Sequence, residues 1–345
     1  MKTIQVKASK NYDVIIGSSL LAFLGEQLLS VSGKSCKVAI ISDSNVWPLY
    51  GDTATENLRD FGFDVINYVF PAGENSKNAE TYLGILNFLA ENNITRSDLL
   101  VALGGGVVGD ITGFAAATFL RGVSFVQIPT TLLAMVDSSV GGKTAINLPT
   151  GKNLIGAFNQ PRLVLCDLDT LGTLPESVFR DGCAEVIKYG VIYDAELFDH
   201  LSENGLAFDR EYVISRCVEL KRDVVEQDEF DTGARQMLNF GHTIGHGIEA
   251  QSGFSVTHGQ AVAIGMAIVS KSGCPAIYQQ IIDVLDKFHL PTTTNFTAEQ
   301  LYTSALSDKK RAGGTVNLII PTEIGRCAIV PTNVNALKSF IEEGL

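Results

Sequence analysis

The sequence predicts an α/β protein with an amino-terminal, Rossmann-like parallel sheet followed by a mostly α-helical carboxyl-terminal part. Short apolar runs alternate with helical stretches as far as about residue 174, and helical periodicity dominates after that point. Alternation of this kind indicates βα units and a parallel sheet. The length of 345 residues favours about two domains of roughly 150 residues each. We expect one domain over 1–174 and a second over 175–345, with a ligand site in the cleft between them.

Six segments of the first part are predicted strands, because most are continuously apolar, as in strands that are covered on both faces. They are Val14–Gly17, Lys37–Ser42, Asp64–Phe70, Leu99–Leu103, Ser124–Ile128 and Arg162–Asp167. Between the third and the fourth, Ser76–Asn92 has apolar residues at helical spacing.

Five segments of the second part have helical patterns, and a short β segment is expected afterwards at Val316–Pro321. The helical segments are Glu176–Glu203, Asp209–Gln227, Gly233–Gln251, Gly259–Ser272 and Pro275–Phe288.

Composition and charge exclude several classes of protein. Hydrophobic residues make up 46% and charged residues 19% of the chain, which is too apolar for a disordered protein. The net charge is −12, and the longest basic block is Lys309-Lys310-Arg311. A general nucleic-acid binder would display a broad positive face, so we set that class aside. An anionic ligand would need a local cluster of lysine and arginine.

The cysteines and the amino terminus indicate a cytoplasmic protein. The six cysteines are scattered without a C-x-x-C pair, which favours reduced thiols over a disulfide framework. The first residues lack an apolar region of signal-peptide length. No window reaches the ~18 apolar residues that a membrane span requires.

A glycine-rich turn follows the predicted strand Leu99–Leu103. The run Gly104-Gly105-Gly106-Val107-Val108-Gly109-Asp110 fits G-x-G-x-x-G, whose glycines let a pyrophosphate approach the start of a helix. A tight structural βα turn gives the same pattern, so both interpretations stay open. The turn follows a middle strand, and the next strand closes on Pro129-Thr130-Thr131 without an acidic residue. Asp43 is the better candidate for binding ribose hydroxyls.

The segment 137–153 is expected to be a loop. Gly142-Lys143-Thr144 is similar to the end of a Walker A loop, but Asp137 stands where that motif requires glycine. Two lysines and an aspartate in a glycine-rich run are typical of an oxyanion-binding loop, and a solvated connecting loop is the alternative.

Histidines concentrate between positions 242 and 258. On a continuous helix, Arg235, Asn239, His242 and His246 fall at i, i+4, i+7 and i+11, which places them on one stripe. Glycines 241, 245 and 247 each cost about 1 kcal/mol in a helix interior, so something bulky is expected to approach closely. The pair His242 and His246 lacks the glutamate of H-E-x-x-H, which argues against a zincin protease.

A carboxylate could complete a three-ligand metal site with two of these imidazoles. The candidate is Glu185, in Ala184-Glu185-Val186-Ile187-Lys188, where Glu185 and Lys188 share a helix face. An exposed i, i+3 ion pair is the alternative reading of this segment.

Taken together, these segments resemble the 3-dehydroquinate synthase family of sugar-phosphate cyclases along almost the whole chain. Further matching pieces are Arg121-Gly122-Val123, Pro129-Thr130-Thr131-Leu132-Leu133, Gly151-Lys152-Asn153-Leu154-Ile155-Gly156-Ala157-Phe158 and His258-Gly259. Gln260 departs from the family, since many members have Glu after His-Gly.

The resemblance implies a phosphorus–oxygen lyase of the shikimate pathway that serves chorismate and aromatic amino acid biosynthesis. It would convert 3-deoxy-D-arabino-heptulosonate 7-phosphate to 3-dehydroquinate and phosphate. The implied sequence is NAD-dependent oxidation at C5, phosphate elimination, re-reduction, ring opening and aldol closure. A sister sugar-phosphate cyclase and a metal-dependent glycerol or alcohol dehydrogenase are the alternatives.

The resemblance also implies the roles of individual residues. The implied metal ligands, for Zn²⁺ or Co²⁺, are Glu185, His242 and His258. The carboxylate of the substrate would be held by Lys221 and Arg235, and its ring hydroxyls by Asp137 and Lys188. The implied phosphate contacts are Lys143, Asn153, Asn239, His246 and one of Lys309 or Lys310. The implied NAD contacts are Asp43, Glu74, Lys77, Gly104, Gly105, Gly106, Val107, Asp110, Thr130, Thr131, Lys143, Lys152, Thr173 and Leu174. Arg121 would reach a phosphate in the neighbouring subunit, which implies a homodimer.

Overall fold

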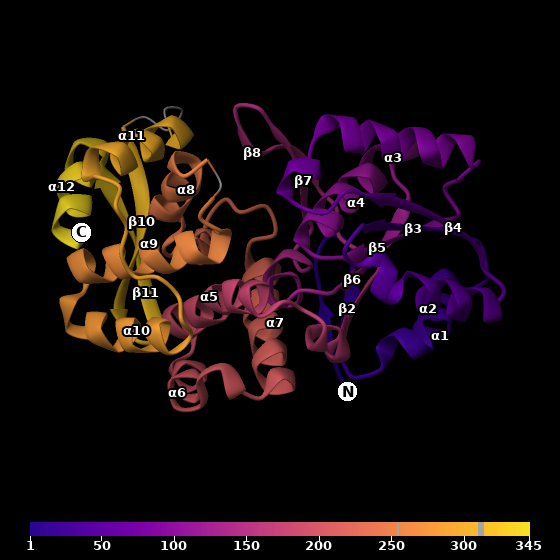
Figure 1. The fold of residues 1–345 in the computed structure, drawn as a ribbon, viewed down its shortest axis with the longest axis horizontal. Helices are drawn as coiled ribbons and strands as arrows, with labels where there is room; N and C mark the ends of the chain where they lie inside the picture. Colours follow the sequence, from indigo (N-terminus) through magenta and orange to yellow (C-terminus); the bar gives the residue numbers. More distant parts are fainter. Residues whose placement is uncertain (254, 310–313) are drawn as a thin grey trace. The chain divides into compact units, whose positions relative to one another are not determined.

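The computed structural model describes residues 1–253, 255–309 and 314–345, and it divides into two compact units (Figure 1). The first unit contains Met1–Leu174 and Lys221–Phe230, and the second contains Pro175–Leu220 and Asp231–Leu345. Among the helices of the described ranges, none is both long and apolar enough to cross a membrane.

The first unit is built on a seven-stranded sheet in the order β1-β2-β9-β6-β5-β3-β4, which confirms the predicted α/β class. Only the β1–β2 pair is antiparallel. The strands are β1 (Lys2–Val6), β2 (Tyr12–Gly17), β3 (Lys37–Asp43), β4 (Asp64–Phe70), β5 (Leu99–Gly104), β6 (Ser124–Pro129) and β9 (Leu163–Asp167). All six predicted strands are present, and β1 was not predicted.

Helices cover both faces of this sheet, which explains why its strands are apolar throughout (Figure 1). Along β3, Val38 and Ile40 pack with α1 (Leu24–Ser32) and α2 (Trp47–Asp60), whereas Ala39 and Ile41 pack with α3 (Ala79–Glu91) and α4 (Gly106–Thr118). All four of these β3 side chains are fully buried. The carboxyl ends of the parallel strands therefore meet at one edge, where α4 begins.

The expectation of a loop over 137–153 is wrong. A π-helical turn, η4 (Ala134–Ser138), leads into an antiparallel hairpin of β7 (Lys143–Leu148) and β8 (Gly151–Phe158). Gly141 and Gly142 have φ of 96° and 70°, so the glycines form the turn into the hairpin rather than a long loop. Most of β8 is exposed, which removes the alternating apolar signal of a strand.

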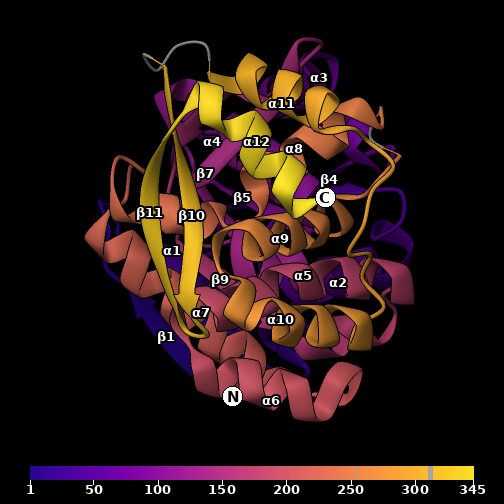
Figure 2. The same ribbon diagram turned by 90° about the vertical axis from the view of Figure 1, so that its left-hand side faces the viewer.

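The second unit is mostly helical, as predicted, with one two-stranded sheet, β10 (Thr315–Glu323) and β11 (Arg326–Asn333). The hairpin lies along α9 and α12 (Figure 2). The helices are α5 (Glu176–Tyr193), α6 (Ala195–Asn204), α7 (Arg210–Gln227, whose last turns belong to the first unit), α8 (His242–Gln251), α9 (His258–Gly273), α10 (Pro275–Lys287), α11 (Ala298–Lys309) and α12 (Val334–Gly344).

Two predicted helices are each interrupted. The segment Glu176–Glu203 breaks at Asp194, whose carboxylate accepts a hydrogen bond from the Leu197 backbone N–H and caps α6. The segment Gly233–Gln251 consists of a 3₁₀ helix, η7 (Ala234–Asn239), and then α8. The predicted single stripe through Arg235, Asn239, His242 and His246 is therefore wrong.

Candidate active site

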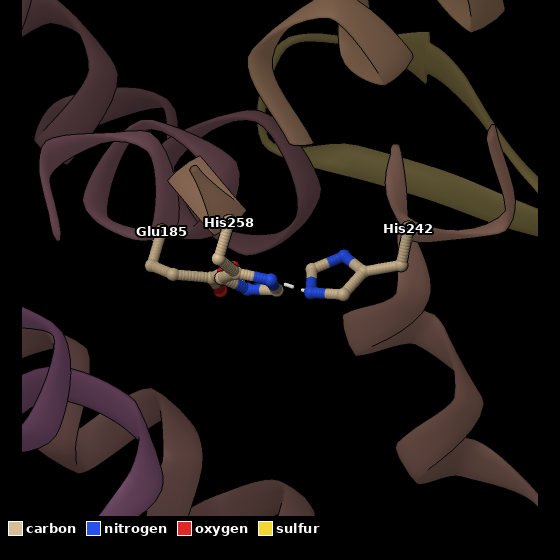
Figure 3. Close-up of side chains that lie close together, drawn as sticks. All are labelled: Glu185, His242 and His258. Atoms are coloured by element: carbon tan, nitrogen blue, oxygen red, sulfur yellow. Dashed lines mark hydrogen bonds and ion pairs between the residues drawn. The ribbon is translucent and has the colours of Figure 1, made fainter. Parts of the chain in front are cut away.

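Three side chains of the second unit point toward one another from three different helices (Figure 3). Glu185 comes from α5, His242 from the start of α8 and His258 from the start of α9. Glu185 Oε1 lies 3.2 Å from His242 Nε2 and 3.2 Å from His258 Nε2. Zinc ligands at about 2.0–2.1 Å in a tetrahedral shell lie about 3.3 Å apart. The three atoms thus have the spacing of metal ligands.

Each imidazole has a second partner that orients it. His242 Nδ1 lies 3.0 Å from the Phe240 carbonyl oxygen, and His258 Nδ1 lies 3.3 Å from Glu249 Oε2. With a proton on each Nδ1 donating to these oxygens, each Nε2 faces Glu185. Such partners are typical of metal-binding histidines. Sequence reasoning missed Glu249, although its i+7 position relative to His242 on one helix would have signalled it.

Glu185 is fully buried and is also paired with Lys188, whose ammonium donates to Oε2. Burial alone would raise the pKa of Glu185, but Lys188 and His242 outweigh it, so the pKa lies well below the usual value. Burial lowers the pKa of His258, but hydrogen bonds to Glu185 and Glu249 raise it to about 10. The cluster therefore holds an ionised carboxylate, and a metal ion would displace the Nε2 proton of His258.

A close backbone crossing of α8 and α9 brings His242 and His258 together. Gly241 has φ of 76° and precedes α8, and a Cβ there would lie 2.7 Å from the Val262 carbonyl oxygen. A Cβ on Gly265 would lie 2.0 Å from the Gly241 carbonyl oxygen, and one on Gly245 would lie 3.0 Å from the Ala261 carbonyl oxygen. The predicted close approach is confirmed at Gly241 and Gly245, where the neighbour is the backbone of α9, and it is less close at Gly247, where an added Cβ would lie 3.3 Å from Ser304 Cβ. The same crossing breaks the helix between Asn239 and His242.

His246 lies one turn after His242 and is exposed. Its ring centroid is 5.4 Å from that of His242 and 6.3 Å from that of His258. His246, Glu249 and His258 form a second group whose ligand atoms lie within 4.8 Å of one another. The two groups share His258, so the structure contains two alternative ligand sets.

The remaining candidates of this unit have different environments. Lys188 is buried within the cluster, Arg235 is buried in η7, and Asn239 is partly buried at the end of η7. Lys309 ends α11, with its side chain outside the described part, and Lys310 lies outside the described residues.

The first unit places the glycine turn at the end of β5. Gly104 ends the strand, Gly105 precedes α4 and Gly106 is its first residue. Neither a side-chain cap nor an acidic residue occupies the first turn of α4, so its backbone N–H groups and positive dipole end suit an anion. A Cβ on Gly105 would lie 3.0 Å from Thr131 Cγ2, so close packing also requires glycine here. The geometry is therefore compatible with both interpretations of the motif.

A polar cluster joins α4 to the β7–β8 hairpin. Lys77 is buried, and its Nζ lies 2.5 Å from Asp110 Oδ2 and 2.6 Å from Asn153 Oδ1. Asn147 Nδ2 donates to Glu74 Oε1 at 2.7 Å. Burial would lower the pKa of Lys77, but Asp110 and Glu74 outweigh it and raise the pKa. Asn153 has φ of 55°, a strained conformation that this cluster stabilises.

A second ion pair brings residues from distant parts of the sequence together. Lys221 Nζ lies 2.6 Å from Asp137 Oδ1, which links the end of α7 to η4 within the first unit. The side chain of Lys221 is 6% exposed and that of Asp137 is 23% exposed. Asp137 thus pairs with Lys221, the cation that the resemblance implies will bind the carboxylate of the substrate.

The other candidates of the first unit lie at strand ends, on the hairpin or at the surface. Asp43 ends β3 and accepts from the backbone N–H groups of Asn45 and Val46. Thr130 is buried after β6, and Thr131 accepts from the Ala134 N–H. Lys143 begins β7, Lys152 lies in β8 and Val107 lies in α4, while Glu74 begins η2 (Glu74–Ser76). Thr173 contacts the Tyr50 hydroxyl, and Leu174 is the last residue of the first segment of this unit. Arg121 is exposed and has φ of 64°.

An α/β unit with a glycine-rich βα turn and a helical unit with a histidine–carboxylate cluster at the spacing of metal ligands are the features that define the class of this protein, an α/β enzyme. The family models for the 3-dehydroquinate synthase N-terminal and C-terminal regions match residues 67–181 and 182–311. The chain belongs to the 3-dehydroquinate synthase family, which confirms the resemblance and makes it an enzyme of the phosphorus–oxygen lyase class.

Similar proteins match over nearly their full lengths. A 3-dehydroquinate synthase of Clostridium acetobutylicum is 45% identical, over 95% of this chain and 96% of that protein. One of Enterococcus faecalis is 43% identical, over 99% of this chain and 98% of that protein.

The fold is also that of two solved cyclases. A 2-deoxy-scyllo-inosose synthase solved with carbaglucose-6-phosphate, NAD⁺ and Co²⁺ has a TM-score of 0.89 at 25% identity, with both chains covered in full. A 2-epi-5-epi-valiolone synthase of Streptomyces hygroscopicus, solved with NAD⁺ and Zn²⁺, has a TM-score of 0.88 at 27% identity over 99% of this chain and 98% of that one.

Proposed function

We propose that this chain acts as a 3-dehydroquinate synthase, which converts 3-deoxy-D-arabino-heptulosonate 7-phosphate to 3-dehydroquinate and phosphate. Family membership supports this proposal, and the observation that carries it is the convergence of Glu185, His242 and His258. The reaction places the enzyme in the shikimate pathway, upstream of chorismate and the aromatic amino acids.

Glu185, His242 and His258 are the proposed ligands of Zn²⁺ or Co²⁺. Two imidazoles and a carboxylate are the donor set of a catalytic zinc site with an open position, and the 3.2 Å separations fit such a shell. The solved cyclases bound to Co²⁺ and Zn²⁺ support this choice of metals. When bound, the metal would act as a Lewis acid that binds substrate hydroxyls and lowers their pKa. Lys188 would keep Glu185 ionised and orient a ring hydroxyl.

The first unit is proposed to bind NAD at the end of β5. The uncapped first turn of α4 would accept the pyrophosphate, and Asp43 at the end of β3 would accept hydrogen bonds from ribose hydroxyls. Lys77, held by Asp110 and Asn153, would place a positive charge beside the same region. When bound, NAD would accept a hydride from C5 and return it later. The further NAD contacts proposed are Glu74, Val107, Thr130, Thr131, Lys143, Lys152, Thr173 and Leu174.

Cationic and polar side chains are proposed to bind the two anionic groups of the substrate. Lys221 and Arg235 would hold the carboxylate, and Asp137 would orient a ring hydroxyl while it holds Lys221 in place. The proposed phosphate contacts are Lys143, Asn153, Asn239, His246 and one of Lys309 or Lys310. These residues would give an acidic protein the local positive charge that its substrate requires.

We further propose a cytoplasmic homodimer in which Arg121 reaches the phosphate of the neighbouring subunit. Arg121 is exposed and follows Leu120, and both have positive φ. Such strain is consistent with a residue that a binding contact holds in place. None of the six cysteines forms a disulfide in the described structure, which is compatible with a reducing compartment.

A phosphate-release assay with a panel of substrates tests the function. We expect release from the heptulosonate phosphate, loss of release after chelation, and recovery with Zn²⁺ or Co²⁺. Full turnover by protein shown to be metal-free would overturn the metal assignment. A preference for a substrate that lacks a carboxylate would indicate a sister cyclase. Accumulation of NADH in proportion to product would indicate a dehydrogenase instead.

A further inference from the structure

Glu249 is a buried acid that the proposed reaction does not use. Its side chain is 3% exposed, and Oε2 lies 3.3 Å from His258 Nδ1. Glu249 follows His242 by seven residues on α8, and this spacing puts both side chains on the same helix face. One helix therefore supplies a proposed ligand and, two turns later, a contact to a second proposed ligand.

The backbone of His258 is held firmly at the start of α9. Thr257 and Gln260 form a capping box, and Asp181 on α5 accepts from the Thr257 hydroxyl and from the Gln260 N–H. A Cβ on Gly259 would lie 2.0 Å from the Asp181 carbonyl oxygen. These contacts fix where the His258 side chain begins, but none of them fixes the rotation of its ring.

The ring of His258 is also the least enclosed of the three proposed ligands. Its side chain is 28% exposed, compared with 11% for His242 and 0% for Glu185. Packing therefore restrains this ring less than it restrains the other two side chains. Besides the contact of Nε2 with Glu185 itself, the hydrogen bond from Nδ1 to Glu249 is the contact that can orient this ring.

We propose that Glu249 is a positioning residue for the metal centre. Its carboxyl oxygen accepts a hydrogen bond from the Nδ1–H of His258. This contact favours the tautomer whose Nε2 is available to a metal, and it makes that nitrogen a stronger electron-pair donor. The inference rests on the proposed metal site. His242 has a backbone carbonyl in the equivalent place, so Glu249 is the side-chain member of the two orienting contacts.

The test compares Zn²⁺ affinity in four metal-free, full-length proteins by competition with a chromophoric chelator. They are the unsubstituted chain, Glu249→Ala, Glu249→Gln and, as a control on the same helix, Gln251→Ala. Gln251 is exposed and donates to Ser304, so its loss removes a contact of α8 without touching the cluster. We expect Glu249→Ala to bind Zn²⁺ about 10–100-fold more weakly, and Gln251→Ala to match the unsubstituted chain.

Glu249→Gln distinguishes positioning from ligation. Its amide oxygen can still accept from His258 Nδ1, so its affinity should recover most of what alanine loses. Recovery of Zn²⁺ affinity in Glu249→Gln would also exclude a merely structural effect. A visible spectrum of the Co²⁺ form that is altered in Glu249→Ala but not in Glu249→Gln would exclude it as well. The near-isosteric amide keeps the volume of the buried side chain, so the comparison remains available if the alanine variant does not fold.

Two outcomes would overturn the inference. Unchanged affinity in Glu249→Ala would show that the ring needs no such partner. Equal and severe losses in the alanine and glutamine variants would make Glu249 a ligand, in the alternative set with His246 and His258. If the unsubstituted chain itself bound no Zn²⁺, the proposed function would fail, and that result is distinct from both.

Discussion

The two ligand sets of the helical unit make opposite predictions for His242→Ala and His246→Ala. If Glu185, His242 and His258 bind the metal, the first variant should lose it and the second should keep it. If His246, Glu249 and His258 bind it, the outcome is reversed. The geometry favours the first set, because Glu185 Oε1 lies 3.2 Å from both Nε2 atoms and His246 is exposed.

The size of the effect can be bounded from the contacts. Loss of a residue that only orients a ligand costs about 10–100-fold in metal affinity. Loss of a ligand should therefore exceed about 100-fold, or about 2.7 kcal/mol. For His246→Ala we expect a free energy of unfolding within about 0.5 kcal/mol of the original, because an exposed side chain is removed. Its turnover should fall by about 10²–10⁴-fold if it assists phosphate expulsion as an acid or base.

Metal content of the purified variants and competition titrations with Zn²⁺ provide the assay. His200→Ala is the matched control, because it removes a histidine of α6 that contacts the Tyr212 ring. Far-ultraviolet circular dichroism should be unchanged in all three, since alanine is the better helix former. Retention of metal by His242→Ala, or equal loss of metal from His242→Ala and His246→Ala, would refute the assignment.

Three further substitutions test the surroundings of the cluster. Lys188→Met should lower the free energy of unfolding of the metal-free protein by about 3–5 kcal/mol, because it removes the ammonium partner of the fully buried Glu185 carboxylate. A urea titration that shows a loss of less than about 1 kcal/mol would contradict the role of the pair. Arg235→Ala should raise KM and lower kcat at a combined cost of about 2–5 kcal/mol, whereas unchanged steady-state kinetics would remove Arg235 from the substrate site. Gly265→Ala should cost about 1–3 kcal/mol or more by overpacking against the Gly241 carbonyl, and it should weaken Zn²⁺ binding because α8 must move. A thermal melt and a Zn²⁺ titration that match the unsubstituted protein would contradict that last expectation.

The strands that could be predicted from the sequence are those whose signal comes from burial. β3 and β5 are covered by helices on both faces, and such strands are recognisable as continuous apolar runs. β8 has exposed residues along most of its length, and β11 has only half-buried and exposed residues, without a buried one. Neither leaves a pattern that periodicity can detect, so the sequence predicts a loop over 137–153, where β7 and the start of β8 lie.

The candidate site was predictable to a similar, partial degree. Residue types and family motifs pointed to Glu185, His242 and His258, because those motifs are local in the sequence. Contacts between distant segments were not predictable. Lys221 pairs with Asp137 across 84 positions, and no spacing rule relates two such residues. The orienting role of the Phe240 carbonyl was also hidden, since a backbone oxygen has no signature in the sequence.

The break between η7 and α8 explains why helical spacing was misleading at this site. Helix propensity treats Gly241 as a small cost within a continuing helix, but its φ of 76° ends one segment and starts another. The Gly241 carbonyl oxygen then lies 2.0 Å from where a Cβ on Gly265 would be. The backbone contact between α8 and α9 thus sets the separation of His242 and His258, whose ring centroids lie 5.3 Å apart. The proposed metal site therefore depends on glycines that are not among its ligands, and a search for ligand residues alone would overlook them.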